Sequence, residues 1–279
     1  MTNAADLQAA ATVRFGEGPA ISAEGLDGAA RDGLHRLIDR RSCRDYAERA
    51  VPEGLVSLLI AAGLSAPTKS DLQQADVVWV RDRALRAELM TDVPGADWIA
   101  KAPVFLVVCG NGARFASLFE GRDFVNNHFD ALFNAIGDAA IVLEGIVAAA
   151  AIAGLGTCPI SQIRNRAREV SRLLDLPDRV FPFAGVCLGH PAHEASVSPR
   201  LDLGMTVHQD RYDTDAFQRL APGYDTRRNV AKPFARQRAA ERFGTDPDYG
   251  WREDKRRQYS TPERADFGAY LRDLGFAFD

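Results

Sequence analysis

The sequence predicts a globular protein of mixed helices and strands. Its 279 residues are 46% hydrophobic and 26% charged, a balance that is typical of folded chains and sufficient for a large core. Residues 103–109 and 180–188 are continuous apolar runs bounded by Gly or Pro, which predicts two central strands of a sheet. Residues 131–153 are apolar almost all round, which predicts a long helix buried on more than one side.

The other elements follow from the spacing of apolar residues and from Gly and Pro. Helical spacing predicts a helix over residues 29–39. Pro52 suits the first turn of a second helix, and Gly63 is a C-terminal stop for it. A Ser-, Thr- and Pro-containing loop covers residues 65–70. We further expect a strand at 77–80, helices at 83–90 and 163–174, a polar, turn-rich stretch at 221–258, and a last helix that starts at Thr261.

Charge and composition argue against several classes of partner. The chain carries 34 Lys and Arg against 38 Asp and Glu, a net charge of −4, so no overall positive field favours nucleic acid or anionic membranes. Residues 1–28 lack the basic start and apolar run of a secretory signal, and we expect a loose N-terminal arm there. The apolar stretch 139–156 is shorter than the about 20 residues of a membrane span. The cysteines form no CxxC pair, and we expect reduced thiols in a cytoplasm.

A dense set of hydrogen-bond donors follows the first predicted helix. Arg40-Arg41-Ser42-Cys43-Arg44 places three guanidiniums and a hydroxyl within five residues, which suits a phosphate group. A solvated basic helix end, stabilised by the helix dipole, is the more common origin of such a cluster. Arg200 offers a further cation for the same phosphate, although an exposed turn arginine is the ordinary explanation. Gly154 and Gly156 permit close approach of a flat ligand, or simply cap the long helix.

One segment suggests a different chemistry. Gly185-Val186-Cys187-Leu188-Gly189 has the spacing of a nucleophile elbow with Cys in place of Ser, as a cysteine hydrolase would require. The candidate bases His190, His193 and His208 crowd too close to Cys187 for the usual order of such enzymes. His190 and His193 flank Pro191 and have no third ligand at a recognised spacing, so we expect no metal. The sequence also lacks a P-loop and a GxGxxG motif.

Taken in order, these motifs resemble the nitroreductase family. The likeness runs over residues 34–212 as a helix, Arg-Arg-Ser-x-Arg, a second helix, an Ala-Pro-Thr loop, a strand, a long apolar helix, Gly-Leu-Gly and a strand. Within the family the sequence is most similar to the oxygen-insensitive NADPH nitroreductase and NADPH-flavin oxidoreductase branch. The segments that carry this likeness are Arg83-Ala84-Leu85-Arg86, Gly154-Leu155-Gly156, Leu173-Leu174-Asp175-Leu176-Pro177, Gly185-Val186-Cys187-Leu188-Gly189 and Pro199-Arg200-Leu201.

The resemblance implies a fold and an activity. The fold is an α+β sandwich with a central, mainly antiparallel sheet flanked by helices, in an intertwined homodimer with FMN at each subunit interface. The chain then divides into a flexible N-terminal arm (1–28), an FMN-binding domain (29–215), and a C-terminal excursion and helix on the partner subunit (216–279). The activity is a ping-pong transfer of electrons from NADPH or NADH to small electron-poor acceptors such as nitroaromatics, quinones and flavins.

The resemblance also assigns positions that contact the flavin, and no acid–base catalytic residue. Arg40, Arg41 and Ser42 would hold the FMN phosphate. Arg200 would join them, and Arg44 would lie near the pyrimidine edge of the ring, where a cation stabilises the reduced form. The other assigned positions are Pro67, Thr68, Lys69 and Ser70 along the ribityl chain or ring edge, from the other subunit, and Pro159, Ile160 and Ser161 on the dimethylbenzene or N5 side.

Some residues depart from the pattern of the branch. Ser198 stands where a Lys is usual, and Ser161-Gln162 replaces a Gly-Gly pair. Lys69 is a candidate to supply the positive charge that the Lys usual at position 198 would carry. Two alternative functions remain, a hydrolase that uses Cys187 and a protein that binds flavin without turnover. A basic pool is available for the 2′-phosphate of NADPH: Arg227, Arg228, Lys232, Arg236, Arg238 and Arg242.

Overall fold

The computed structural model describes residues 2–17, 21–91, 95 and 97–279. Contacts between Cα atoms divide them into two compact units. One unit contains residues 1–41 and 196–263, and the other contains residues 42–195 and 264–279.

The larger unit is built on a four-stranded antiparallel sheet in the order β1-β2-β4-β3. The predicted strands at 77–80, 103–109 and 180–188 are confirmed, and the last two are central. The edge strand β3 was not predicted as a strand, because it is short and carries Pro159, which an edge tolerates. The strands are β1 (Ala75–Trp79), β2 (Val104–Asn111), β3 (Gly156–Ile160) and β4 (Val180–Gly189).

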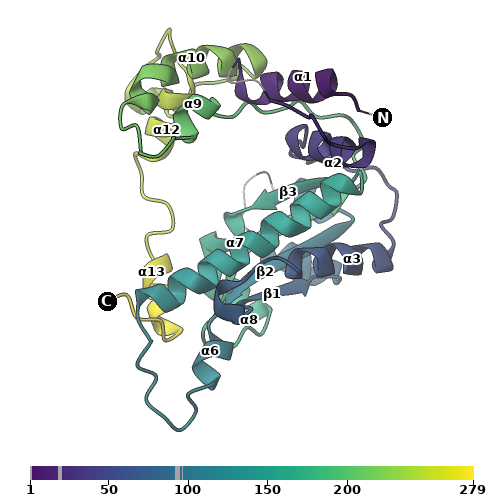
Figure 1. The fold of residues 1–279 in the computed structure, drawn as a ribbon. Coiled ribbons are helices and arrows are strands. Elements are labelled where there is room, and N and C mark those ends of the chain that lie inside the picture. Colours follow the sequence, from purple (N-terminus) through teal and green to yellow (C-terminus); the bar gives the residue numbers. More distant parts are fainter. Residues whose placement is uncertain (1, 18–20, 92–94, 96) are drawn as a thin grey trace. The chain divides into compact units, whose positions relative to one another are not determined.

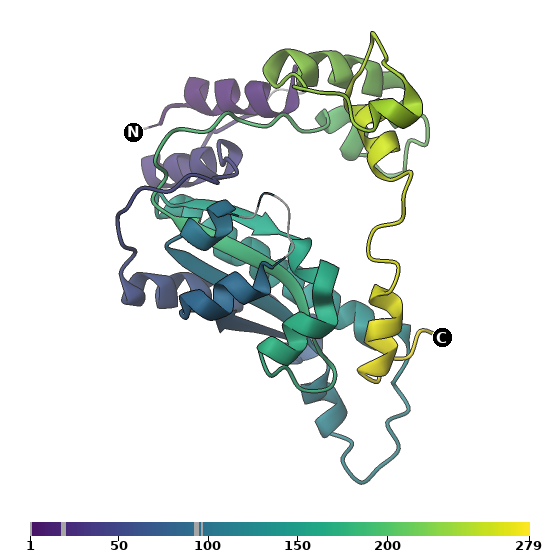
Figure 2. The same cartoon turned by 180° about the vertical axis from the view of Figure 1, so that it is seen from behind.

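Helices cover both faces of this sheet, as Figures 1 and 2 show from opposite sides. Strand β2 is buried along its whole length, and its side chains alternate between two cores. Leu106 packs with Ile146 of α7, whereas Phe105 packs with Ile99 of α5. The fold is therefore the predicted α+β sandwich. The first face carries α3 (Glu53–Leu64) and α7 (Phe129–Ile152), and the second carries α4 (Arg83–Leu89), α5 (Asp97–Lys101) and α8 (Ala167–Leu173).

Helices α3 and α7 approach each other closely through two glycines. A Cβ on Gly145 would lie 2.9 Å from the Cα of Gly63, and a Cβ on Gly63 would lie 2.5 Å from Cγ1 of Ile146. Side chains at either position would force the helices apart. Helix α7 is long and apolar enough to cross a membrane, but its packing on the sheet and on α3 is that of a core helix, as predicted.

The end of the chain returns to the larger unit. The last helix, α13 (Phe267–Asp273), packs on α8, where the hydroxyls of Tyr270 and Ser171 lie 2.7 Å apart. The prediction that this helix starts at Thr261 was wrong. Arg264 has a left-handed φ of 55°, which interrupts any helix from that cap. The remaining short elements of this unit are η1 (Lys69–Asp71), α6 (Ala113–Ser117) and η2 (Gln162–Arg166), the last of which replaces the start of the helix expected at 163–174.

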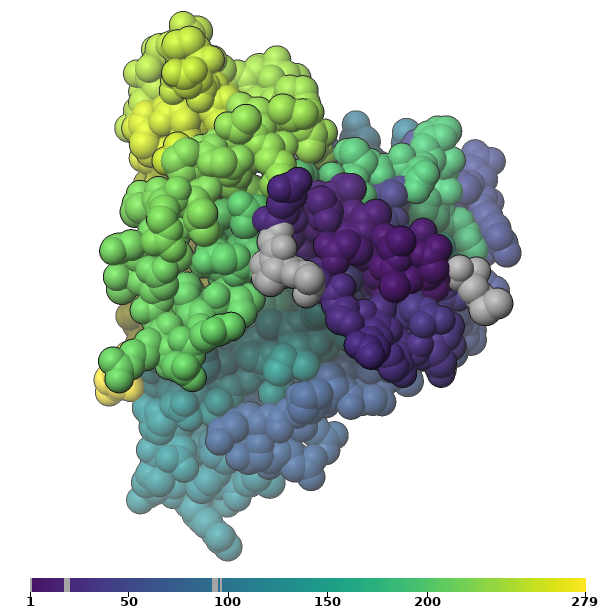
Figure 3. Space-filling view, turned by 45° about the horizontal axis from the view of Figure 1, so that its top comes forward, coloured from purple at the N-terminus to yellow at the C-terminus, as the bar shows by residue number. Residues whose placement is uncertain are grey.

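The smaller unit contains a helix that the sequence analysis did not predict. Within the expected loose arm, α1 (Ala4–Phe15) starts at a capping box formed by Asn3 and Asp6. It lies against α2 (Gly28–Ile38), and its Leu7 and Ala11 are buried. Figure 3 shows both helices in purple. The expectation of a loose arm followed from the lack of a basic start and an apolar run, and the alanines of α1 give little periodicity from which to predict a helix.

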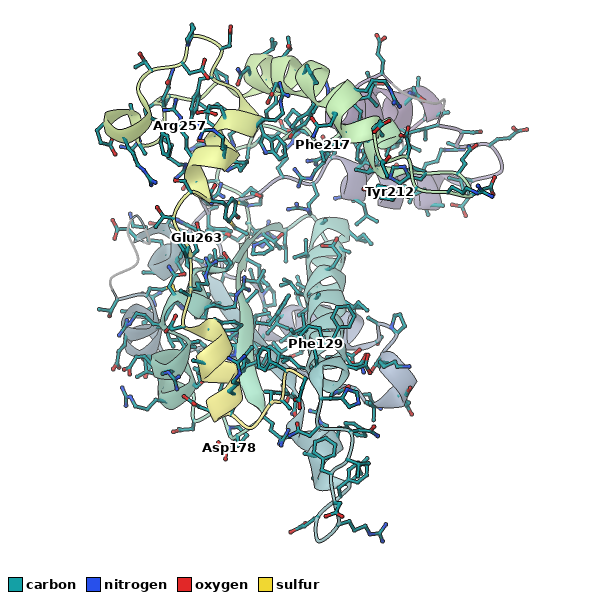
Figure 4. All side chains as sticks on the ribbon, turned by 90° about the vertical axis from the view of Figure 1, so that its left-hand side faces the viewer. Phe129, Asp178, Tyr212, Phe217, Arg257 and Glu263 are labelled. Atoms are coloured by element: carbon teal, nitrogen blue, oxygen red, sulfur yellow. The ribbon has the colours of Figure 1, made fainter. Side chains whose placement is uncertain are left out.

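The C-terminal part of the smaller unit is more ordered than its composition suggested. The stretch 221–258, expected as polar turns, holds helices whose charges pair with one another. Arg257, labelled in Figure 4, is almost fully buried and donates to Glu253 at 2.6 Å and to the carbonyl of Gly244 at 2.8 Å. The C-terminal part of the smaller unit contains α9 (Leu203–Thr206), which precedes this stretch, and then α10 (Ala216–Ala231), α11 (Ala240–Phe243) and α12 (Trp251–Gln258).

Candidate functional site

The structure gathers the predicted phosphate-binding arginines of the smaller unit around Arg14. Arg40 and Arg41 follow the end of α2, and Arg200 lies in the loop before α9. The carbonyl of Arg14 accepts from the backbone N–H of Arg200 at 2.7 Å. Burial, followed by the charges of Arg200 and Arg40, lowers the pKa of the Arg14 guanidinium to about 10. Arg41 pairs with Asp39 at 3.0 Å.

In the larger unit, Ser42 and Arg44 lie beside the free edge of β3. Ser42 forms a parallel bridge with Thr157, and the backbone N–H of Cys43 donates to the Thr157 carbonyl at 2.9 Å. The guanidinium of Arg44 is exposed and lies 5.8 Å from the ring centre of Trp98. The sheet edge thus holds the Ser-Cys-Arg segment alongside the start of β3.

The three predicted positions at the end of β3 differ in what they present. Pro159 is exposed at the sheet edge, and Ser161 is exposed just beyond it. The side chain of Ile160 is buried in the core, so only its backbone is available to a ligand. The Ser161 hydroxyl accepts a hydrogen bond from Arg264 at 3.2 Å. Where the resemblance led us to expect Gly-Gly, the chain therefore carries a hydroxyl tied to a cation.

The loop with Pro67, Thr68, Lys69 and Ser70 is fixed by a buried acid, Asp138 of α7. The Asp138 carboxylate accepts from the Thr68 hydroxyl, from the backbone N–H of Lys69 at 3.1 Å and from that of Gln74 at 2.9 Å. Pro67, Lys69 and Ser70 remain exposed. Ser70 adopts a left-handed φ of 52°. The loop therefore presents its backbone and the Lys69 side chain outward from a rigid base.

Sequence reasoning missed two of these residues, Asp138 and Arg14. The signal for Asp138 was an acid within an apolar helix, but Glu144 gives the same signal and is exposed. Only packing distinguishes the two acids. The signal for Arg14 was weaker still, because an arginine in the last turn of a helix is usually solvated.

The geometry does not support the hydrolase reading of Cys187. Residues 185–189 lie within strand β4, whereas a nucleophile elbow needs a sharp turn from strand to helix. The thiol is fully buried, and burial raises its pKa, which disfavours the reactive thiolate. His193 is exposed and lies 3.6 Å from Asp45. Among the described residues no group of three His, Cys, Asp or Glu is placed to hold a metal ion.

Two family models match the chain. One, described as the nitroreductase family, matches residues 37–96 and 90–190, and the other, described as its C-terminal domain, matches residues 198–279. An FMN reductase (NAD(P)H) of Bacillus subtilis is 36% identical over 184 residues, covering 64% of this chain and 74% of the relative. An oxygen-insensitive NADPH nitroreductase of Salmonella typhimurium is 31% identical over 179 residues, covering 64% and 74%.

Solved structures agree over a longer span. The structure of B. megaterium NfrA2 has a TM-score of 0.78 and 30% identity, covering 89% of this chain and 99% of that one. The NADPH:FMN oxidoreductase from Vibrio harveyi, complexed with NAD+, has a TM-score of 0.75 and 26% identity, covering 88% and 99%.

Proposed function

Because this chain belongs to the nitroreductase family, we propose that it is an FMN-dependent oxidoreductase that moves electrons from NAD(P)H to small electron-poor acceptors. The observation that carries the proposal is the gathering of Arg40, Arg41 and Arg200 around Arg14. Arg14 donates to three carbonyls, so the guanidiniums of Arg40, Arg41 and Arg200 are the ones that suit a dianionic phosphate. Relatives named for FMN and NADPH supply the identity of the cofactor and the donor.

The donors present suit the phosphate of FMN in charge and in hydrogen bonding. Arg40, Arg41, Arg200 and the adjacent Ser42 would hold the phosphate. In the larger unit, β3 carries an exposed Pro159, where the resemblance places the flavin ring. FMN, when bound, would accept a hydride from the nicotinamide and then reduce the electron acceptor. The protein binds and orients the reactants, and Arg44 contributes positive charge.

The loop at residues 67–70 serves orientation in this proposal. Its anchoring to Asp138 fixes the Thr68 side chain and the backbone at Lys69. In the proposed dimer this loop lines the ribityl chain or ring edge of the partner subunit's cofactor. A rigid base keeps such contacts from costing conformational entropy each time a ligand binds.

A homodimer is part of the proposal, because α7 and α3 carry large apolar side chains on the surface. Phe133 of α7 is 59% exposed, Ile141 of α7 is 42% exposed and Leu58 of α3 is 63% exposed. Several large apolar side chains exposed on two packed helices are a common feature of interaction surfaces. A second copy of the chain would cover them.

The proposal also includes the division of the chain and its location. We propose an FMN-binding domain over residues 29–215 and a C-terminal excursion over residues 216–279. We further propose that the enzyme is cytoplasmic, with reduced thiols.

The test is the visible spectrum of the purified protein before and after anaerobic addition of NADPH or NADH. We expect a yellow protein that either or both nucleotides bleach, and recovery of colour when a quinone, a nitroaromatic or free flavin is added. Yellow protein that neither nucleotide bleaches would identify a flavin carrier without turnover. Colourless protein that cannot take up FMN would contradict the proposal.

A further inference from the structure

Arg14 stands out among the described arginines because its buried side chain binds three carbonyl groups. It lies in the last turn of α1 and is 5% exposed. Its Nε donates to the Ile38 carbonyl at 2.8 Å, its Nη1 donates to the Ser198 carbonyl at 2.8 Å, and its Nη2 donates to the Arg40 carbonyl. The planar guanidinium suits such a fixed fork of acceptors, which an ammonium group does not match.

The three acceptors belong to the two segments that carry the phosphate-binding cations. Ile38 and Arg40 lie at the end of α2, and Ser198 lies 184 residues beyond Arg14 in sequence. The backbone of Arg14 adds to this link, because its carbonyl accepts from the Arg200 N–H at 2.7 Å and from Nη1 of Arg227 at 3.3 Å. Both the side chain and the backbone of one residue therefore join the two segments.

This arrangement costs electrostatic free energy unless an anion is present. Arg40, Arg41 and Arg200 all repel the charge of Arg14, and Asp39 is the acid that offsets them. Asp39 also pairs with Arg41, and the nearby Asp202 pairs with Arg227. A phosphate with two negative charges relieves the remaining repulsion.

We propose that Arg14 is a positioning residue that assembles the phosphate-binding half of the FMN site by bracing the segments of Arg40 and Arg200 against each other. The inference rests on the proposed function. It assigns a role to helix α1, which lies before residue 37, where the family model begins to match. Arg14 itself spends its donors on carbonyls and acts through the other arginines.

The test compares FMN with riboflavin, which has the same ring and ribityl chain but no phosphate. Each flavin is titrated into the full-length apo-protein, and binding is followed by the quenching of flavin fluorescence. We expect the wild-type protein to bind FMN more tightly than riboflavin. In Arg14→Gln the affinity for FMN falls by about tenfold or more, whereas the affinity for riboflavin is unchanged. The ratio of the two affinities therefore reports on the phosphate alone.

Two further variants separate positioning from general loosening. Arg31→Gln is the matched control, because Arg31 also donates to two carbonyls, those of Leu26 and Thr2, at 2.6 and 3.2 Å within the same N-terminal region. It should leave the ratio at the wild-type value. Arg14→Lys keeps the charge but cannot span three carbonyls, so it should lower the ratio by less than Arg14→Gln. If Arg14→Gln does not fold, the ratio of the FMN and riboflavin affinities in Arg14→Lys tests the inference.

The outcomes distinguish the two proposals. Wild-type protein that binds neither flavin overturns the proposed function and the inference with it. Wild-type protein that prefers FMN, together with Arg14 variants that keep the whole preference, overturns the inference alone. An equal fall in the ratio for Arg31→Gln also overturns it, because the effect would then belong to the N-terminal region as a whole.

Discussion

The hydroxyl of Thr68 donates a hydrogen bond to the carboxylate of Asp138, which lies 70 residues away in sequence and is 3% exposed. The same carboxylate accepts two backbone N–H groups from the loop that follows α3. We expect Asp138→Ala to lower the free energy of unfolding by about 3 kcal/mol, because it leaves buried donors without an acceptor. Urea denaturation measures the change.

Asp130, in the first turn of the same helix, is the matched control for Asp138. It is exposed and accepts from Asn134 at 2.9 Å. Asp130→Ala should cost less than about 1 kcal/mol, through its favourable position near the helix N-terminus. Equal losses for the two variants would show that Asp138 has no special role in holding the loop.

Glu253 gives the smaller unit a pH-dependent source of stability. Hydrogen bonds from Arg256 and Arg257 lower the pKa of its carboxyl from 4.5 to about 2. A depressed pKa stabilises the fold above pH 4.5, and the contribution is lost as the pH falls from 4.5 to about 2. Glu253→Gln should therefore reduce the urea midpoint at pH 7, and the difference from wild type should shrink over that window. A difference that does not change with pH would refute this account.

Arg44 is expected to tune the flavin. Its guanidinium lies over Trp98 at 5.8 Å and is exposed at the sheet edge. In the proposed complex it stabilises the negative charge of the reduced ring, so Arg44→Gln should lower the two-electron midpoint potential by about 30 mV, which corresponds to about 1.4 kcal/mol. Equilibration with a reference dye measures it. Arg44→Lys should restore most of the potential, and no change in either variant would place Arg44 away from the ring.

Cys187 should be dispensable for activity. Because its thiol is fully buried in β4 and its pKa is raised by burial, iodoacetamide should leave it unmodified in the folded protein, as mass spectrometry will show. Cys187→Ala should keep NAD(P)H oxidation. Loss of NAD(P)H oxidation without loss of flavin in that variant would contradict this prediction and give Cys187 a role in the reaction.

The dimer prediction rests on Phe133 of α7. Replacing this 59% exposed apolar side chain by Glu places a charge in the proposed interface. Size-exclusion chromatography with light scattering should show a monomer for Phe133→Glu. Val13→Glu changes a similarly exposed apolar residue on α1 and should stay dimeric. A dimer in both variants would move the interface elsewhere.

The sequence predicted elements whose signal is local and missed those whose signal comes from tertiary contacts. Strands β2 and β4 and helix α7 are continuous apolar segments, and each was found near its true bounds. Strand β3 is defined by its pairing with β4 and not by its composition. Helix α12 was missed for the same reason, because its charged residues are buried by tertiary contacts. An example is the hydrogen bond from Arg257 to the Gly244 carbonyl.

The candidate site divides in the same way. The cation-rich segment after α2 and the residue Arg200 were visible as motifs. Arg14 holds the phosphate segments, and Asp138 holds the loop at residues 67–70. Both residues act through burial, which is a property of the folded chain and not of the local sequence. The flavin contact that the resemblance assigns to Ile160 stays a prediction, and the structure limits it to the backbone because the side chain packs in the core.

The close contact of Gly63 and Gly145 ties the start of the Asp138-anchored loop to the helix whose outer face is proposed to meet the second subunit. If association moves α7, the movement would reach the loop through both of these attachments. If the loop then binds flavin more tightly, thermodynamic reciprocity requires that flavin tighten the association by the same factor. Cofactor-free protein at low concentration would then dissociate into subunits more readily than the loaded enzyme.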